Sequence, residues 1–193
     1  IVFEGANLGR ASGEPAALVS ARYAVPGGLS LQARRCVVSV PNTQIECVTS
    51  AGVGHGFEWS VIVDGVAASM SATEAFSMSY APPSIDGVFG VGTTNALSAG
   101  GQQFVVTGRG FGPPALATPT VRYFSSDAEL WATFYVASSC RVDSDSQITC
   151  ATAPGVGVGH RVVVDDIGGQ SSMASAEDQT ISYAPPVIAA YGG

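Results

Sequence analysis

An internal repeat is the feature of this sequence that most limits what it can fold into. Residues 78–85 read Met-Ser-Tyr-Ala-Pro-Pro-Ser-Ile and residues 181–188 read Ile-Ser-Tyr-Ala-Pro-Pro-Val-Ile, so that Tyr80 recurs 103 positions later as Tyr183. Further pairs keep this spacing to within one residue: Gly5 with Gly108, Cys36 with Cys140, and Cys47 with Cys150. A fixed period indicates a modular architecture. The 193 residues therefore predict two copies of one small domain.

The runs between these landmarks favour β-strands over helices. The chain has 24 Gly and 11 Pro, which separate short runs rich in Val, Ile, Thr, Tyr and Phe, and no stretch keeps a 3.6-residue apolar period for long. Residues 104–107 read as a strand that enters a glycine-dependent turn at 108–112. Residues 59–63 read as a strand closed by Asp64-Gly65, a sequence typical of tight hairpins. An all-β fold is predicted.

The order of motifs in the second copy resembles that of an IPT/TIG domain. The residues that carry the resemblance are Pro82-Pro83-Ser84-Ile85, Gly100-Gly101, Gly108-Arg109-Gly110-Phe111-Gly112, Cys140, Ile148-Thr149-Cys150, Pro154 and Ser182-Tyr183-Ala184-Pro185-Pro186. The first copy departs from this pattern with Leu8 in place of Phe and with Ser50 near the position of Pro154. The resemblance implies tandem immunoglobulin-like β-sandwiches of the early-set type, without a shared active site.

The repeat and the resemblance together predict three segments. Residues 1–81 are expected to form the first IPT/TIG domain, residues 82–184 the second, and residues 185–193 an additional strand. The Ala-Pro-Pro run after each Tyr fixes an extended backbone and cannot donate to a central ladder. We therefore expect the joint between the two domains at Tyr80, Pro82 and Pro83.

The four cysteines predict one disulfide bond in each copy. Ten residues lie between Cys36 and Cys47, and nine lie between Cys140 and Cys150, which suits a bridge between neighbouring strands. A bridge that closes a loop of this size stabilises a domain by about 3 kcal/mol in the chain-entropy model. Disulfides imply an oxidising compartment, so a secreted or cell-surface protein is expected. Four buried free thiols are the alternative.

The charge pattern argues against binding to nucleic acids. The chain has fifteen acidic residues, eight Arg and no Lys, for a net charge of −7, and it shows no basic stripe interleaved with aromatic residues. No apolar run reaches the roughly 18 residues of a membrane-spanning helix. The sequence does not open with a charged and then apolar leader, so it is expected to start after a signal peptide or inside a longer protein.

No group of residues in the sequence predicts catalysis or metal binding. His55 and His160 lie in Gly-rich segments without a Ser/His/Asp motif, and we expect both to be exposed and without a catalytic role. Residues 143–146 resemble part of a calcium-binding loop but lack its later Gly and terminal Glu, which favours a solvated turn. The cysteine spacing is not that of a zinc site. We therefore predict no enzymatic activity, cofactor or metal.

Four aromatic side chains and one loop leave alternatives open. Trp59, Trp131, Phe134 and Tyr135 could be core or an exposed patch, and core is favoured for at least half of them because alternate side chains of a strand are buried. The sequence has no Asn-x-Ser/Thr sequon. Any glycan is therefore expected to be O-linked, and the segment 112–120 is the candidate acceptor loop.

The two ends of the chain differ under the repeat. Ile1 maps near Phe104, so the first copy is expected to lack its first strand and to offer an acceptor edge at Ile1, Val2 and Phe3. The other end repeats an opening strand without a following domain, at Pro185, Pro186, Val187, Ile188, Ala189, Ala190 and Tyr191. This arrangement is typical of assembly by strand donation. Covalent continuation of a longer repeat array would give the same ends.

The favoured function is a structural repeat unit of an extracellular or cell-surface filament or stalk, assembled head to tail into a linear or helical polymer. A ligand-binding ectodomain of a receptor or adhesin, which recognises a protein or a glycan, is the alternative. An accessory module of a carbohydrate-active enzyme is a third candidate, and it needs a catalytic domain outside this sequence.

Overall fold

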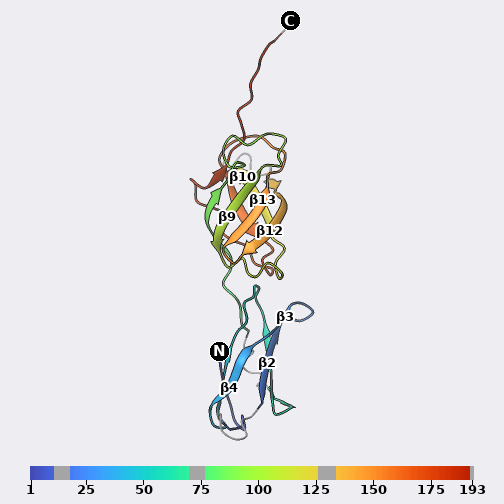
Figure 1. The fold of residues 1–193 in the computed structure, drawn as a ribbon, viewed down its shortest axis with the longest axis vertical. Helices are drawn as coiled ribbons and strands as arrows, with labels where there is room; N and C mark the ends of the chain where they lie inside the picture. The colour runs from blue at the N-terminus through green and yellow to red at the C-terminus, as the bar shows by residue number, and fades with distance from the viewer. Residues whose placement is uncertain (11–17, 70–76, 126–133, 192–193) are drawn as a thin grey trace. The chain divides into compact units, whose positions relative to one another are not determined.

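Every regular element that the structure describes is a β-strand. The computed structural model describes residues 1–10, 18–69, 77–125 and 134–191, and within these ranges it contains fifteen short strands and no helix. Within the same ranges, no helix has the length and apolar character that would let it span a bilayer. The chain divides into two compact units, Ile1–Ser79 (unit 1) and Tyr80–Gly193 (unit 2) (Figure 1). The all-β prediction is confirmed.

Unit 2 is a sandwich of two four-stranded sheets. In the first sheet the order is β12-β13-β9-β8, and in the second it is β11-β10-β14-β15. Neighbouring strands within both sheets are antiparallel. The bounds are β8 Ser84–Phe89, β9 Gln103–Arg109, β10 Thr120–Ser125, β11 Phe134–Val136, β12 Ser138–Ser144, β13 Gln147–Ala151, β14 His160–Asp165 and β15 Thr180–Ile181. Figure 1 shows β9, β13 and β12 side by side in the first of these sheets.

The core of unit 2 lies between its two sheets. Along β9, the side chains of Phe104 and Val106 are fully buried while their neighbours are more accessible. Val121 and Tyr123 on β10 are fully buried in the same alternating manner. A period of two is what a strand with one face on a core requires, and it explains why the Val- and Phe-rich runs of the sequence form these strands.

Unit 1 repeats this plan with one strand fewer in its first sheet. Its sheets have the orders β1-β5-β4 and β3-β2-β6-β7. The bounds are β1 Val2–Glu4, β2 Val19–Ala24, β3 Ser30–Gln32, β4 Arg34–Val40, β5 Gln44–Val48, β6 Glu58–Val63 and β7 Val66–Ala67. The registers correspond as well, because Tyr23 pairs with Trp59 where Tyr123 pairs with Val162.

The glycines predicted to form turns do so with positive φ, except for Gly108. Asp64 and Gly65 connect β6 to β7 with φ values of 48° and 81°, as expected for a two-residue hairpin. Gly110 and Gly112 also have positive φ. Gly108, however, lies within β9 and is not among the residues of positive φ. The strand therefore runs further than the sequence predicts, and Gly108 is not a turn residue.

The aromatic side chains divide between core and surface. Trp59 is buried, with its ring centroid 5.0 Å from that of Phe3 and 4.5 Å from that of Tyr23. Phe134 is exposed, and Tyr135 is partly buried. Trp131, which the sequence also placed between core and patch, lies outside the described residues.

Candidate strand-acceptor site

Strand β8 closes the first sheet of unit 2. It pairs with β9 from Ser84 opposite Arg109 to Phe89 opposite Val105, with one irregularity between Ile85 and Gly87. Its Val88 side chain is buried, and the Val88 amide donates a 2.9 Å hydrogen bond to the side-chain oxygen of Gln179. β8 therefore satisfies the outer backbone groups of β9 and covers this edge of the core.

Strand β1 of unit 1 corresponds to β9, but no described strand lies along one of its edges. Within the described residues, β1 pairs only with β5. Two side chains of this segment are more exposed than their counterparts in unit 2. Ile1 is 47% exposed although its counterpart Phe104 is fully buried, and Phe3 is partly buried although its counterpart Val106 is fully buried. Val2 is 51% exposed. The predicted acceptor edge at Ile1, Val2 and Phe3 is thus a strand edge with accessible apolar side chains, which is a site prone to pairing.

A groove of about 1070 Å³ opens beside this edge. One side is formed by β1 and the turn that follows it to Gly9, and the other by Val61, Val63 and the β7 region at 66–69. Ile45 of β5 also lines the groove. In unit 2 the corresponding space beside β9 and β14 is where β8 lies, since β8 contacts both strands. The groove therefore has the location of a missing edge strand.

The predicted assembly strand is unpaired in the described chain. Residues 184–191 form no strand and are exposed at every position. The side chains of Val187, Ile188 and Tyr191 are 87%, 85% and 98% exposed. The backbone of this tail is last held at Ala184, whose amide donates to the carbonyl of Ala96. We refer to residues 184–191 as the tail.

The predicted joint lies at the start of unit 2. The Tyr80 carbonyl accepts a 3.1 Å hydrogen bond from the Gln170 side chain, and Pro83 is buried. The carbonyl oxygens of Pro82 and Ala81 lie against Gly110, at 3.4 and 3.5 Å from the position that a β-carbon would occupy there. Tyr80, Pro82 and Pro83 are therefore packed onto unit 2 as its lead-in segment.

Comparison with known families agrees with this architecture. The model of the IPT/TIG domain matches residues 83–183, just over half of the chain. The chain belongs to the IPT/TIG family. The match begins at Pro83 and ends at Tyr183, so the IPT/TIG domain includes β8 and excludes the tail. No curated protein matches the chain. IPT/TIG domains are immunoglobulin-like modules that are generally not catalytic, and they fit an extracellular protein.

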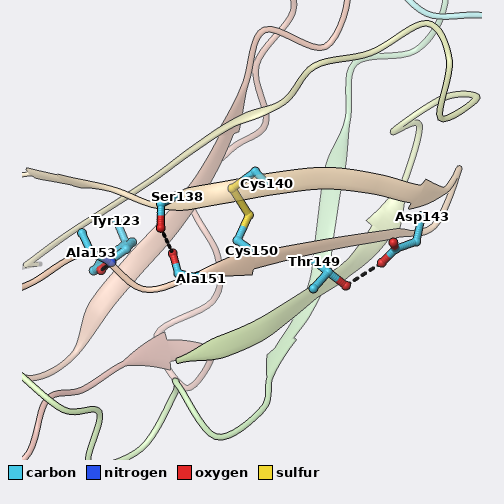
Figure 2. The surroundings of a disulfide bond; sticks show 8 residues. All are labelled: Tyr123, Ser138, Cys140, Asp143, Thr149, Cys150, Ala151 and Ala153. Carbon is cyan, nitrogen blue, oxygen red and sulfur yellow. Dashed lines mark hydrogen bonds between the residues drawn. A yellow bond between two sulfur atoms is a disulfide. The ribbon is translucent and has the colours of Figure 1, made fainter. Parts of the chain in front are cut away.

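The IPT/TIG domain contains one of the two disulfides. Cys140 on β12 is bonded to Cys150 on β13, and in unit 1 Cys36 on β4 is bonded to Cys47 on β5. Figure 2 shows the Cys140–Cys150 bridge between the two strands. No described cysteine is free. The disulfides fit an oxidising, extracellular environment, and neither of them lies on the β1 edge.

The Asp143 carboxylate of the IPT/TIG domain is used for local structure. It accepts a hydrogen bond from the Thr149 hydroxyl at 2.5 Å (Figure 2). It also accepts hydrogen bonds from Gln147 at 3.2 Å and from Arg141 at 2.8 Å. These bonds, of which that from Thr149 has the largest effect, lower the pKa of Asp143. Within the described ranges, no three His, Cys, Asp or Glu side chains gather as a metal site would require. Asp143 therefore holds β12 against β13.

The expectation that both histidines are exposed is wrong for one of them. His55 is exposed, but His160 is the first residue of β14 and is buried among the rings of Tyr123, Tyr135 and Tyr183. Its Nε2 lies 3.0 Å from the Val156 carbonyl, and its Nδ1 has no partner. Burial lowers the pKa of His160, so the ring is neutral at pH 7. The repeat could have indicated this burial, because His160 lies 103 residues after Phe57, which is buried in unit 1.

Proposed function

We propose that this chain is a non-enzymatic structural repeat unit of an extracellular or cell-surface filament or stalk, in which copies join head to tail. One observation carries the proposal. Among the residues that the structure describes, the first sheet of unit 1 has no strand at its β1 edge and has a groove where unit 2 has β8. The tail repeats the sequence that opens β8.

A contact between the tail of one copy and unit 1 of the next is heterologous. It uses two different surfaces, so every copy still presents one unused surface of each kind. Unless the rotation between copies closes a ring, such a contact generates a linear or helical fibre. The disulfides support a role outside the cell because they form and persist in oxidising compartments, where they stabilise small domains.

Burial of apolar side chains of the tail favours association. Complete burial of an Ile or comparable apolar side chain contributes about 1.5–3 kcal/mol, and Ile188 and Tyr191 of the tail are now in water. The backbone of an added strand also satisfies the outer amide and carbonyl groups of β1. Ordering of the tail costs free energy that opposes this gain. The Pro-Pro start reduces this cost because the tail is already restricted to extended conformations.

The test is the mass of the purified chain, produced in an oxidising compartment. We expect concentration-dependent, polydisperse species by light scattering and linear particles by electron microscopy. Deletion of residues 184–193 should leave folded, monodisperse monomers with both disulfides. A matched control is Met173→Asp, which places a charge on an exposed apolar residue beside the Val164 end of β14 and should leave assembly unchanged.

Two outcomes would overturn the proposal. A full-length chain that stays monomeric up to millimolar concentration would favour a ligand-binding ectodomain instead. Polymers that persist after the deletion of residues 184–193 would show that copies join through a different surface.

A further inference from the structure

We propose that the groove beside β1 is a specific binding site for the tail of a second copy of this chain, in a single register that Gly5 determines. This inference rests on the proposed function and adds the site, its occupant and the pairing of residues. Three independent observations support it: the space at Gly5, the register of β8, and the path of the Pro-Pro segment.

Position 5 is a glycine although nothing in the described chain prevents a side chain there. In unit 2 a β-carbon on the corresponding Gly108 would lie 1.9 Å from the Ser84 carbonyl oxygen, so only glycine allows β8 to approach. In unit 1 a β-carbon on Gly5 would meet only the Leu8 side chain, at 3.6 Å or more. Neither Gly5 nor Gly108 has a positive φ. At Gly5, no backbone atom of the described chain is among the atoms nearest to the β-carbon position, where Gly108 has the Ser84 carbonyl.

The register follows from the pairing of β8 with β9. Ser84 lies opposite Arg109, Ile85 opposite Gly108, Gly87 opposite Thr107, and Val88 opposite Val106. Moving each residue by the repeat spacing gives the tail pairs at the edge of β1: Val187 with Ala6, Ile188 with Gly5, Ala190 with Glu4, and Tyr191 with Phe3. Ala189 takes the irregular position of Asp86. The tail carbonyl that faces Gly5 is then that of Val187.

This register places the side chains of Ile188 and Tyr191 in the groove and leaves that of Val187, the counterpart of the exposed Ser84, on the outer face. Val88 is buried and Ile85 is partly buried in unit 2, so their counterparts Tyr191 and Ile188 point inward. Asp86, which is exposed and carries a charge in unit 2, is replaced by Ala189 in the tail. Residues 184–191 carry no charge, which suits a segment that becomes buried.

The Pro-Pro segment supports the same register. In unit 2 the Pro82 carbonyl passes 3.4 Å from the position of a β-carbon on Gly110, which has a φ of 73°. The corresponding residue of unit 1 is Asn7, with a φ of 60°. Asn is among the few residues that adopt this left-handed conformation readily. The turn after β1 therefore has the shape over which Ala184 and Pro185 of the second copy can cross.

A glycine substitution tests the site without removing the tail. Gly5→Ala should leave the monomer folded, since its β-carbon meets only ordinary contacts, but it should weaken assembly by at least about tenfold because the added carbon occupies the carbonyl position. The matched control is Gly28→Ala, at a second glycine of unit 1 without positive φ whose β-carbon meets Val25 at 3.4 Å. It should assemble as the unmodified chain does. Thermal unfolding of both variants checks the fold.

A cysteine pair tests the register. Glu4→Cys combined with Ala190→Cys should give a ladder of disulfide-linked oligomers on non-reducing electrophoresis. Gln44→Cys combined with Ala190→Cys is the control, because Gln44 pairs with Glu4 from the other side and is one strand too far away. A ladder of equal strength from the control pair would overturn the register.

The outcomes separate this inference from the proposed function. If arrays form but Gly5→Ala assembles normally, the groove is not the site, and the head-to-tail proposal stands. If the full chain does not assemble at all, the proposed function fails, and a synthetic peptide of residues 182–193 then decides the site. Binding of this peptide to the full-length Ile188→Asp chain, together with loss of binding when Gly5→Ala is added, supports the groove; absence of binding overturns it.

Discussion

The hydroxyl groups of Tyr123 and Tyr183 lie 2.5 Å apart in the core of unit 2. Tyr183 donates to the Ala153 carbonyl at 2.7 Å, and the Ala153 amide donates to Tyr123 at 2.9 Å. In unit 1, Tyr23 likewise donates to the Ser50 carbonyl and accepts from the Ser50 amide. Tyr183, through its bond to Ala153, anchors the chain immediately before the tail.

Loss of the Tyr183 hydroxyl should destabilise unit 2. Tyr183→Phe leaves the Ala153 carbonyl without this donor and removes a partner of Tyr123. A buried polar group left without its bond costs about 1–3 kcal/mol, so we expect a loss of this size in the free energy of unfolding, measured with urea. Tyr135→Phe is the control, because its hydroxyl makes two longer, exposed bonds to Val156 and should cost about 1 kcal/mol or less. Equal losses in both variants would contradict the anchoring role.

The stability of unit 2 should fall as the pH drops below about 6.5, the ordinary pKa of histidine. Burial lowers the pKa of His160 in the folded state. Below pH 6.5 the unfolded chain therefore binds a proton that the folded chain resists, and unfolding is favoured. The measurement is the free energy of unfolding between pH 5 and 7. Asp143 and Asp165 also have lowered pKa values, but their contribution is lost only in a more acidic range, near pH 4 and below.

His160→Phe provides the decisive variant for this pH dependence, since Phe57 occupies the equivalent buried position in unit 1. The variant should remove most of the loss of stability between pH 7 and 5. His55→Gln, at an exposed histidine, should retain it. If both variants behave like the unmodified chain, His160 does not cause the effect.

The sequence predicts those parts of the fold that depend on local chemistry. The hairpin at Asp64-Gly65 follows from the residues that tolerate positive φ, and the disulfides follow from the repeat and the short spacing of the cysteines. The role of Gly108 could not be predicted, because it depends on the carbonyl of Ser84, more than twenty residues earlier in the chain. Gly-rich neighbours suggested an exposed loop for His160, but tertiary packing buries this residue at the start of β14.

The candidate site was also predictable only in part. Alignment of the two copies of the repeat predicts the tail residues and the β1 edge. The groove is not visible, since it is formed by side chains of β1, β6 and β7 that are far apart in the sequence. Gly5 looks like an ordinary turn glycine until the space above it is compared with that above Gly108.

Removal of either disulfide should destabilise its own unit by similar amounts. The two bridges join residues 11 and 10 positions apart, for which the chain-entropy model gives about 3 kcal/mol each. We expect Cys36→Ala with Cys47→Ala to lower the unfolding midpoint of unit 1, and Cys140→Ala with Cys150→Ala to lower that of unit 2. Urea unfolding followed by circular dichroism measures both.

The two disulfide variants should differ in assembly. Cys47 lies on β5, the direct neighbour of β1, so loss of its bridge loosens the sheet that accepts the tail. A partner that binds only the folded state adds stability in proportion to the logarithm of its concentration. The midpoint of unit 1 should therefore rise with protein concentration in the Cys36→Ala, Cys47→Ala variant. The same dependence should be absent when residues 184–193 are also deleted. A midpoint independent of concentration in the variant that keeps its tail would mean that the tail does not stabilise unit 1.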